Sequence, residues 1–206
     1  FSMDSRQLTI EGTGTNALKF GGNTFSLTFN RGHGDLVGDI YFEIKLPAPT
    51  DCFTVMPASY ANWTNSIGYA IIESVKLKIG GGTIIDDQSG LWLDIQNELT
   101  DPNRKEWSMV GKVDDQTKLK YFQTQQTTYI VPLRLSLCKT PGLALPIYLS
   151  GTSSTTVKIE VKFKSLANLL LHDGGTVDTS VNLVGFKAIA KYYSLDQDEI
   201  NRIRNN

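Results

Sequence analysis

The residues whose type and spacing could do chemistry are two histidines and two adjacent pairs of carboxylates. His33 and His172 each lie in a glycine-rich turn. A metal site in a barrel needs two or three histidines and a carboxylate that converge on one point. Asp86-Asp87 and Asp114-Asp115 are chain neighbours, and neighbours in a strand point to opposite faces. We therefore expect no metal site, no cofactor, no glycosidase acid–base pair and no enzyme activity.

Three other motifs are incomplete as chemical sites. Gly80-Gly81-Gly82 is not followed by the lysine and helix of a phosphate-binding loop, so we expect a tight turn between strands. Cys52 and Cys138 are far apart and neither belongs to a Cys-x-x-Cys pair, which favours two reduced thiols. Asn62 begins an Asn-Trp-Thr glycosylation sequon. We expect it to be unused, because the first residues lack the layout of a signal peptide.

The composition is that of an ordinary globular protein. Of 206 residues, 40% are hydrophobic, and 20 Lys+Arg against 21 Asp+Glu leave a net charge of −1. So small a charge predicts no direct contact with nucleic acid and no attraction to an anionic membrane. No apolar run approaches the roughly 20 residues of a transmembrane helix. The first residue is not Met, which suggests a trimmed chain or a fragment. The length suits one all-β domain over 1–206, without a linker.

The dominant pattern along the chain has a period of two. Apolar and polar residues alternate in residues 25–29, 40–46, 75–79 and 157–163, and further strand candidates are 6–10, 127–137, 145–149 and 181–193. Sheets with one apolar face are usually antiparallel and packed in pairs. Pro132 places its strand at an edge or a bulge, since proline cannot donate to a ladder. The pattern predicts an all-β fold, an eight-stranded antiparallel jelly-roll sandwich with short helical inserts.

Two segments follow a helical period instead. Between residues 89 and 99 four large apolar side chains recur at three- and four-residue steps, namely Leu91, Trp92, Ile95 and Leu99. Pro102 then ends the helix. We expect this helix to pack against its own sandwich rather than against a neighbouring molecule. Ser194 and Gln197 have the spacing of a capping box, which predicts a second helix at the end of the chain.

Three longer segments carry a more specific pattern. The first is a Trp-led strand that ends in Gly-Gly, followed by Ile-Asp and by Trp-Leu-Asp-Ile-Gln-Asn-Glu-Leu-Thr. The second contains Pro-Gly-Leu-Ala-Leu-Pro, and the third is Tyr-Tyr-Ser-Leu-Asp-Gln-Asp-Glu before Arg202. The residues that carry these motifs are Trp63, Gly80, Gly81, Asp86, Trp92, Glu98, Leu99, Pro141, Gly142, Leu143, Pro146, Asp196, Asp198 and Glu199. In content and order these segments resemble the first jelly-roll domain of the major capsid proteins of nucleocytoplasmic large DNA viruses.

The resemblance implies a structural function. Proteins of this family form homotrimers of pseudo-hexagonal outline, which assemble with copies of themselves and other capsid proteins into an icosahedral shell. It implies a place in the virion capsid, with synthesis and assembly in the host cytoplasm. Family members carry two jelly rolls, so 1–206 would be a single jelly roll, either the N-terminal half of a longer protein or a single-domain relative. The expected contributors to interfaces are the loops 47–62 and 101–126.

A soluble carbohydrate-binding module, a lectin, is the alternative. Jelly rolls also serve as lectins, and exposed aromatic rings could stack on sugars. The candidate rings are Tyr60, Trp63, Trp107 and Tyr121. Binding to glycans by a monomer would favour the lectin, whereas trimers or shell-like particles would favour the capsid protein.

Overall fold

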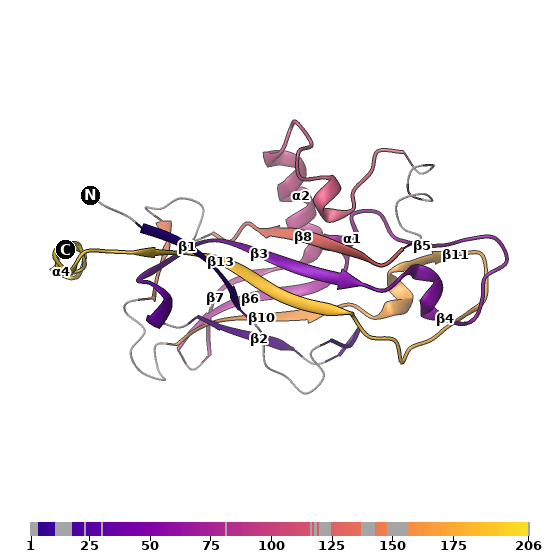
Figure 1. Cartoon of the computed structure of the whole chain (residues 1–206), viewed down its shortest axis with the longest axis horizontal. Coiled ribbons are helices and arrows are strands. Elements are labelled where there is room, and N and C mark those ends of the chain that lie inside the picture. The colour runs from indigo at the N-terminus through magenta and orange to yellow at the C-terminus, as the bar shows by residue number, and fades with distance from the viewer. Residues whose placement is uncertain are drawn as a thin grey trace.

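Two antiparallel sheets packed face to face form the body of the molecule (Figure 1). The computed structural model describes residues 4–10, 18–22, 24–29, 31–80, 82–115, 117, 119, 125–136, 143–147 and 156–205. The first sheet has the order β1 (Asp4–Ile10), β13 (Gly185–Ser194), β3 (Leu36–Leu46), β8 (Thr127–Leu133). The second has the order β2 (Phe25–Phe29), β10 (Val157–Phe163), β6 (Ile72–Ile79), β7 (Thr83–Gln88). Apart from the neighbours β6 and β7, which share the second sheet, successive main strands alternate between the sheets, which is the expected jelly-roll arrangement.

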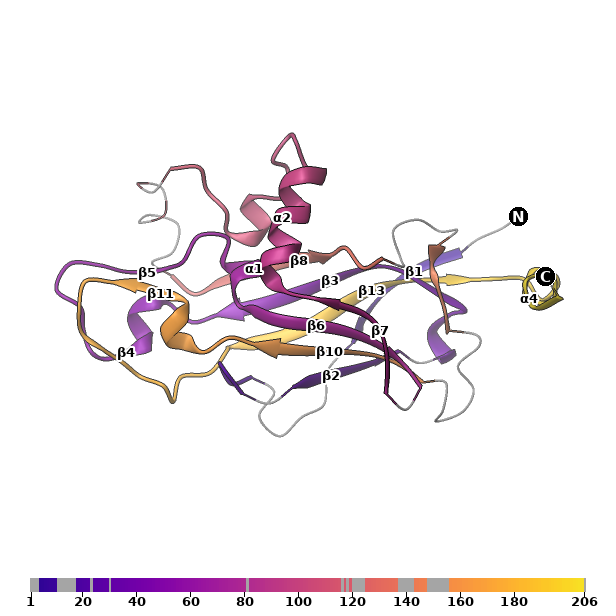
Figure 2. The same cartoon turned by 180° about the vertical axis from the view of Figure 1, so that it is seen from behind.

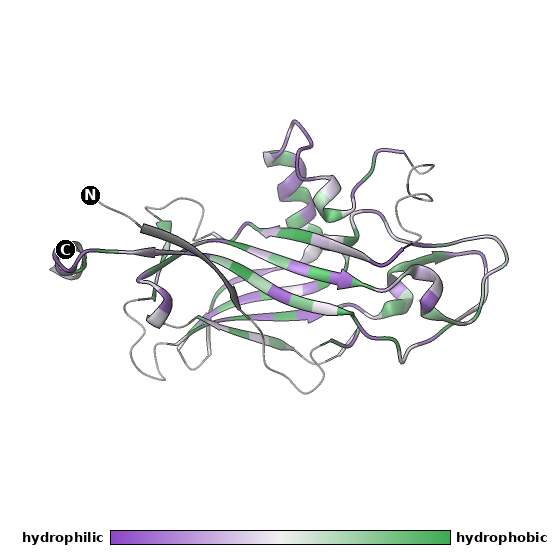
Figure 3. Cartoon of the chain, viewed as in Figure 1, coloured by the Kyte–Doolittle hydropathy of each residue, from purple (hydrophilic) through white to green (hydrophobic). Residues whose placement is uncertain are grey.

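The apolar residues that alternate along the sequence are the residues whose side chains the structure buries. Along β3 the buried side chains Ile40, Phe42 and Ile44 are separated by more exposed ones, and β10 follows the same pattern from Val157 to Phe163. Figure 3 shows this change of hydropathy along the central strands. Because successive side chains face opposite sides, each sheet presents one apolar face to the other.

Aromatic rings join the two sheets at the centre of the core. The ring of Phe186 in β13 meets three others edge to face, Phe25 at 4.6 Å, Phe163 at 5.0 Å and Phe42 at 5.1 Å between centroids. Phe25 and Phe163 come from the second sheet, whereas Phe42 and Phe186 come from the first. Edge-to-face pairs add to the free energy of area burial, so this cluster fixes how the sheets stack.

One of the eight strands differs from the sequence prediction. Of the predicted strand at 145–149, the described residues 145–147 contain β9 (Leu145–Pro146), a two-residue addition to β3, and residues 148 and 149 lie outside the described residues. The eighth main strand is instead β7, which pairs with β6 across the predicted glycine turn. The register of this pair shifts between Leu77 and Lys78, because Ile85 of β7 has no partner there, and the residues of β7 do not alternate. The turn itself is confirmed, with Gly80 at φ 69°; Gly81 lies outside the described residues.

The edge position predicted for Pro132 is confirmed. Among the described strands, β8 is the last of its sheet and pairs with β3 alone, with Pro132 opposite Tyr41. Side chains of β7 bond to the backbone that continues after β8. The Asp86 Oδ2 accepts the Ser136 N–H at 2.8 Å, and Gln88 Nε2 donates to the Arg134 carbonyl at 3.2 Å. Strand β7 thereby joins the open edges of the two sheets.

The segment 47–62, expected as a loop, contributes to two short ladders with later parts of the chain. Strand β4 (Phe53–Val55) pairs with β12 (Thr176–Val177), and β5 (Ala61–Trp63) with β11 (Leu170–His172). Ladders of two or three residues are too short for an alternating pattern, so the sequence did not reveal them. The sequon residue Asn62 is buried within β5, where a glycan has no room.

Four α-helical or 3-10 segments matter for the surface described below. They are α1 (Ile67–Ala70), α2 (Gly90–Thr100), η3 (Ser108–Val110) and α4 (Gln197–Asn205). The helices predicted at 89–99 and at the chain end are thus confirmed. The Trp-led strand is not continuous, because α1 separates Trp63 from β6. No helix among the described residues is long and apolar enough to cross a membrane. Figures 1 and 2 both show α2 projecting from the body beside β8 and α1.

Candidate assembly surface

Helix α2 touches the sandwich through one narrow face. Its buried residues are Gly90, Leu93 and Asn97. A Cβ on Gly90 would lie 2.1 Å from the carbonyl oxygen of Tyr69 and 2.5 Å from that of Ile72. Only glycine therefore permits this close approach of the helix to the backbone between α1 and β6. The Ser89 side chain caps the helix by accepting the Trp92 N–H at 3.2 Å.

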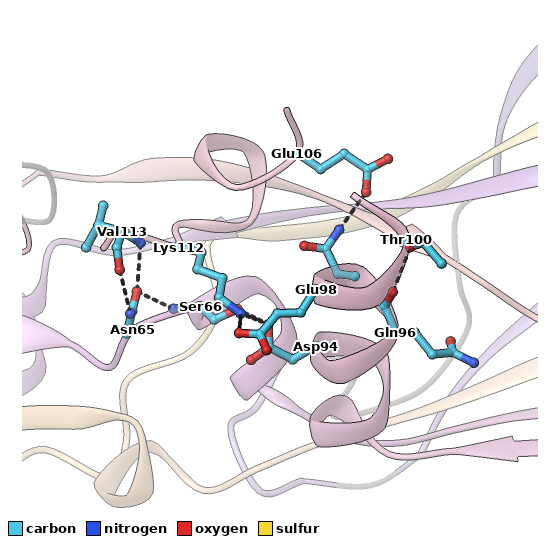
Figure 4. A network of polar contacts seen from close by, with 10 residues as sticks. Asn65, Ser66, Asp94, Gln96, Glu98, Thr100, Glu106, Lys112 and Val113 are labelled. Carbon is cyan, nitrogen blue, oxygen red and sulfur yellow. Dashed lines mark hydrogen bonds and ion pairs between the residues drawn. The ribbon is translucent and has the colours of Figure 1, made fainter. Parts of the chain in front are cut away.

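A buried lysine holds the same helix from the side (Figure 4). Lys112 Nζ lies 2.9 Å from Asp94 Oδ1 and 2.6 Å from Glu98 Oε1, and its side chain is only 7% exposed. Burial acts to lower the pKa of Lys112, but its hydrogen bonds to Glu98 and Asp94 outweigh it and raise that pKa. The hydrogen bond from Lys112 lowers the pKa of Glu98. The Ser66 hydroxyl adds a bond to Asp94 Oδ1 at 2.8 Å.

Glu106, drawn beside α2 in Figure 4, ties this helix to Arg134, the residue that follows strand β8. Its Oε2 accepts from Asn97 Nδ2 and from Arg134 Nη2, each at 2.7 Å. Its backbone N–H donates to Asp101 Oδ2 at 2.7 Å, which lowers the pKa of Asp101.

Asn65 holds the segment that follows Lys112. It bonds Val113 twice, from Nδ2 to the carbonyl and from the Val113 N–H to Oδ1, both at 2.9 Å. Helix α2 and residues 101–113 are therefore held in one orientation by side chains from three parts of the chain.

The large apolar side chains of α2 point away from the sandwich. Leu91 is 66% exposed, Trp92 47%, Ile95 40% and Leu99 75%. The predicted packing of this helix against its own sandwich is confirmed, but Gly90, Leu93 and Asn97 make the contact and the apolar stripe does not. The spacing correctly placed the four residues on one face, but spacing does not say which face is inward. At 100° per residue, the packed face of Gly90, Leu93 and Asn97 lies opposite to the stripe.

The candidate catalytic and metal-binding residues have structural contacts. The ring of His33 lies 5.8 Å from that of Tyr192, and His172 Nδ1 lies 2.6 Å from the Gly174 carbonyl oxygen. Asp87 pairs with Lys76, and Asp114 with Arg104, each at 3.5 Å. Within the described residues, no three histidine, cysteine or acidic side chains gather as metal ligands.

The two cysteines differ in what the structure describes of them. Cys52 is a free, buried thiol, and burial, helped by Asp51 and Asp178, raises its pKa to about 12. At neutral pH it is therefore a protonated thiol and a poor nucleophile. Cys138 lies outside the described residues.

The motif residues are scattered over the fold. Trp63 is buried beside Phe20, with 6.0 Å between ring centroids. Trp92, Glu98 and Leu99 belong to α2, and Asp86 to β7. Leu143 precedes β9, which contains Pro146, while Asp198 and Glu199 lie in α4 and Asp196 immediately before it. Pro141 and Gly142 lie outside the described residues. The sequence did not predict that Gly90 and Lys112 anchor α2. A glycine at the start of a predicted helix was nevertheless a signal, since glycine disfavours helices.

The aromatic residues of the lectin alternative do not form one exposed platform. Trp63 is 1% exposed, so the prediction that it is an exposed ring is wrong. Trp107 lies under the Arg104 guanidinium, which is 4.5 Å from the ring centroid. Tyr60 is 39% exposed, and Tyr121 lies outside the described residues.

The strand order, with a rigid helix inserted between β7 and β8, defines a jelly-roll protein with an apolar helix face turned outward. A family model described as "Major capsid protein N-terminus" matches residues 1–195. The chain therefore belongs to the family of major capsid protein N-termini, as the motifs indicated.

Relatives and solved structures agree with this assignment. The chain is 31% identical over 207 residues to the "Major capsid protein" of Pyramimonas orientalis virus, covering 98% of the chain and 46% of that protein. It is 32% identical over 150 residues to "Probable capsid protein 4" of Acanthamoeba polyphaga mimivirus, covering 70% and 28%. The solved "PBCV-1 virus capsid, quasi-atomic model" superposes with a TM-score of 0.74 at 22% identity, covering 98% and 44%. The chain thus spans less than half the length of these proteins.

Proposed function

We propose that this chain is a structural component of a viral capsid, and that it acts by self-association rather than by catalysis. Three copies form a homotrimeric capsomer of pseudo-hexagonal outline, and capsomers tile an icosahedral shell. The observation that carries this proposal is the family match over residues 1–195 on a jelly roll whose apolar helix face is turned outward.

We propose that residues 1–206 form a single jelly roll, the N-terminal one of two in a longer protein. The chain covers 44% of the "Major capsid protein" of Phaeocystis pouchetii virus and 46% of its Pyramimonas orientalis virus counterpart. These fractions fit one domain of two. The partners would then be copies of the chain and other capsid proteins, in the virion capsid, after assembly in the host cytoplasm.

Charge and exposed side chains support contacts with protein rather than with nucleic acid. A net charge of −1 supplies no field that would draw the chain to DNA. Beyond α2, the loops 47–62 and 101–126 carry exposed apolar side chains, with Val55 59%, Met56 57% and Met109 37% exposed. Assemblies of this kind bury apolar surface between subunits, and we propose these loops as contributors.

The experiment is to measure the mass of the purified protein by sedimentation velocity and to examine the same sample for particles by electron microscopy. We expect trimers, and shell fragments at higher concentration. Screening on a glycan array tests the alternative function, that of a lectin. A protein that stays monomeric at all concentrations and binds a glycan would contradict the capsid proposal.

A further inference from the structure

A hollow of about 580 Å³ lies beside strand β5, at the end of the molecule opposite to α4 (Figures 1 and 2). Tyr60, Asn62 and Thr64 line one side of it. These residues alternate along an extended segment, so their side chains share one face while Trp63 points into the core. Leu171 of β11 pairs directly with Asn62, lies on the same face and also lines the hollow.

The Asn62 side chain is an enclosed polar group that opens onto this hollow. Asn62 is only 6% exposed, yet among the described residues none forms a hydrogen bond with its amide. The amide atoms are also absent from the fully enclosed polar atoms that lack a partner, so they reach the space of the hollow. Because buried amides normally have hydrogen-bond partners, Asn62 is placed to bond a molecule that enters.

The lining of the hollow is held in place by hydrogen bonds. Asn65 bonds Val113 twice at 2.9 Å (Figure 4), which fixes the chain at Val113 and Asp114, two residues on the other side of the hollow. On the β5 side, the Tyr60 N–H donates to Asp173 Oδ1 at 3.3 Å. A site whose lining is already ordered loses less conformational entropy on binding.

The charges of the lining favour a neutral ligand. Of the described residues that line the hollow, none is lysine, arginine or histidine, so a phosphate, sulfate or carboxylate would meet no cation. Asp114 is acidic and would repel an anion. It pairs with Arg104 at 3.5 Å, so a cationic ligand would compete with a cation of the chain itself.

The remaining lining suits a sugar. The Asn62 amide and the Thr64 hydroxyl can each donate and accept hydrogen bonds, as each sugar hydroxyl does. The Tyr60 ring, 39% exposed, and Leu171, 46% exposed, offer apolar surface to the C–H face of a sugar ring. The volume of the hollow lies within the roughly 300–1,000 Å³ of small-molecule sites.

We infer that this hollow binds a neutral sugar, one or two rings at the end of a glycan, with Asn62 and Thr64 bonding its hydroxyls and Tyr60 packing on its ring. The sugar is bound and not covalently attached, because the enclosed Asn62 amide is out of reach of a glycosylating enzyme. One ring beside a polar hollow takes the place of the platform of several rings that the lectin alternative required. The inference goes beyond the capsid function and does not depend on it.

Saturation-transfer NMR with methyl glycosides tests the binding. The probes are the neutral methyl glycosides of glucose, galactose, mannose and N-acetylglucosamine, with methyl glucuronide and methyl sialoside as anionic counterparts. We expect at least one neutral glycoside to bind, in the millimolar range that ligands of this size reach, and the anionic ones not to bind. Saturation transfer to no neutral glycoside, or to the anionic ones alone, would overturn the inference.

Substitutions test whether the sugar lies in the hollow. Asn62→Ala should weaken binding about tenfold and Thr64→Val about fivefold, since each removes hydrogen bonds to the sugar. Asn182→Ala is the matched control, because Asn182 is exposed and does not line the hollow, and circular dichroism verifies that each variant folds. Leu171→Trp fills the hollow from an exposed position and should abolish binding, which keeps the test valid if Asn62→Ala does not fold. Unchanged affinity in both Thr64→Val and Leu171→Trp would mean that the sugar binds elsewhere and would overturn the inference.

A neutral terminal sugar has two possible sources, a glycan of the host cell and a glycan of the virion. Glycans released from each are added as competitors of the bound methyl glycoside. Displacement by either set supports the inference and identifies the source.

The inference and the proposed function fail separately. Trimers and larger assemblies that bind no glycoside would overturn the sugar site and leave the capsid function standing. If, in addition, Leu171→Trp no longer assembles, a protein segment and not a sugar fills the hollow. A protein that stays monomeric at every concentration but loses glycoside binding in Asn62→Ala would support the sugar site and contradict the capsid function.

Discussion

The Asp86 side chain joins the open edges of the two sheets. Its carboxylate accepts the Ser136 N–H at 2.8 Å and the Gln88 amide at 3.0 Å. Both donors would otherwise lack these acceptors at the open edge of the sandwich. The resemblance to capsid proteins had marked Asp86 only as part of a motif, and the structure suggests this physical role for it.

Replacing Asp86 by alanine should therefore destabilise the fold by about 1 kcal/mol, the usual net contribution of a hydrogen bond, since the Ser136 N–H can bond to water and Gln88 Nε2 keeps the Arg134 carbonyl. The matched control is Asp87→Ala at the next position. Asp87 is half exposed and 3.5 Å from Lys76, and such surface pairs contribute only about 0–1 kcal/mol. Urea unfolding of both variants measures the difference. Equal midpoints for the two variants would show that the bond to Ser136 contributes nothing.

At the scale of elements, the attachment of α2 depends on a buried cation more than on apolar packing. Apart from Leu93, the buried residues of α2 are Gly90 and Asn97. Lys112 lies between Asp94 and Glu98 and within 5.1 Å of the Trp107 ring centroid. The helix is thus positioned by charge, which leaves its apolar residues free for the outer face.

Lys112→Met should loosen α2 without unfolding the sandwich. Removing one partner of a largely buried ion pair costs about 3–5 kcal/mol when both partners are buried, and less here because Glu98 is 56% exposed. Lys162→Met is the control, because its pair with Glu73 is about half exposed on both sides. Hydrogen exchange should become faster in residues 90–113 of the first variant only. Unchanged exchange in that segment would contradict the role given to Lys112.

The same attachment should weaken in acid. The hydrogen bond from Lys112 lowers the pKa of Glu98 from its ordinary 4.5, and the Glu106 N–H lowers that of Asp101 from 3.8. A carboxylate whose pKa is lowered by folding stabilises the folded state above its ordinary pKa and loses this effect as the pH falls through the lowered value. We expect exchange in α2, corrected for its intrinsic pH dependence, to rise below about pH 4. Glu98→Gln should reduce this acid response; a response of the same size would assign it to other groups.

For the whole molecule, the stacking of the sheets depends on the ring cluster around Phe186. Its ring contacts Phe42 of its own sheet and Phe25 and Phe163 of the other. Strand β13, which carries it, pairs with β1 and β3 in the middle of the first sheet. A substitution at this position therefore changes the packing of both sheets.

Phe186→Ala should lower the free energy of unfolding by about 3–5 kcal/mol, as phenylalanine truncations in cores do. Met56→Ala, at a 57% exposed position, should change it by less than about 0.5 kcal/mol. Thermal unfolding followed by circular dichroism compares the two. Similar melting temperatures for both variants would mean that the ring cluster does not hold the sheets together.

Local patterns in the sequence predicted much of the secondary structure. Alternating apolar residues predicted seven of the main strands, since burial in a sandwich repeats every two residues. The helix at 89–99 and the glycine turn before it were predicted for similar reasons. Strand β7 and the two small sheets were not, because a bulged edge strand and ladders of two or three residues leave no periodic signal.

The sequence by itself determined which residues share a face and which family they recur in, because both are properties of order along the chain. Only the tertiary structure decided which face of α2 looks outward. That choice depends on Gly90 meeting the backbone at Tyr69 and on Lys112 meeting Asp94 and Glu98. These contacts join residues 14 to 21 positions apart, and no repeat along the chain records them.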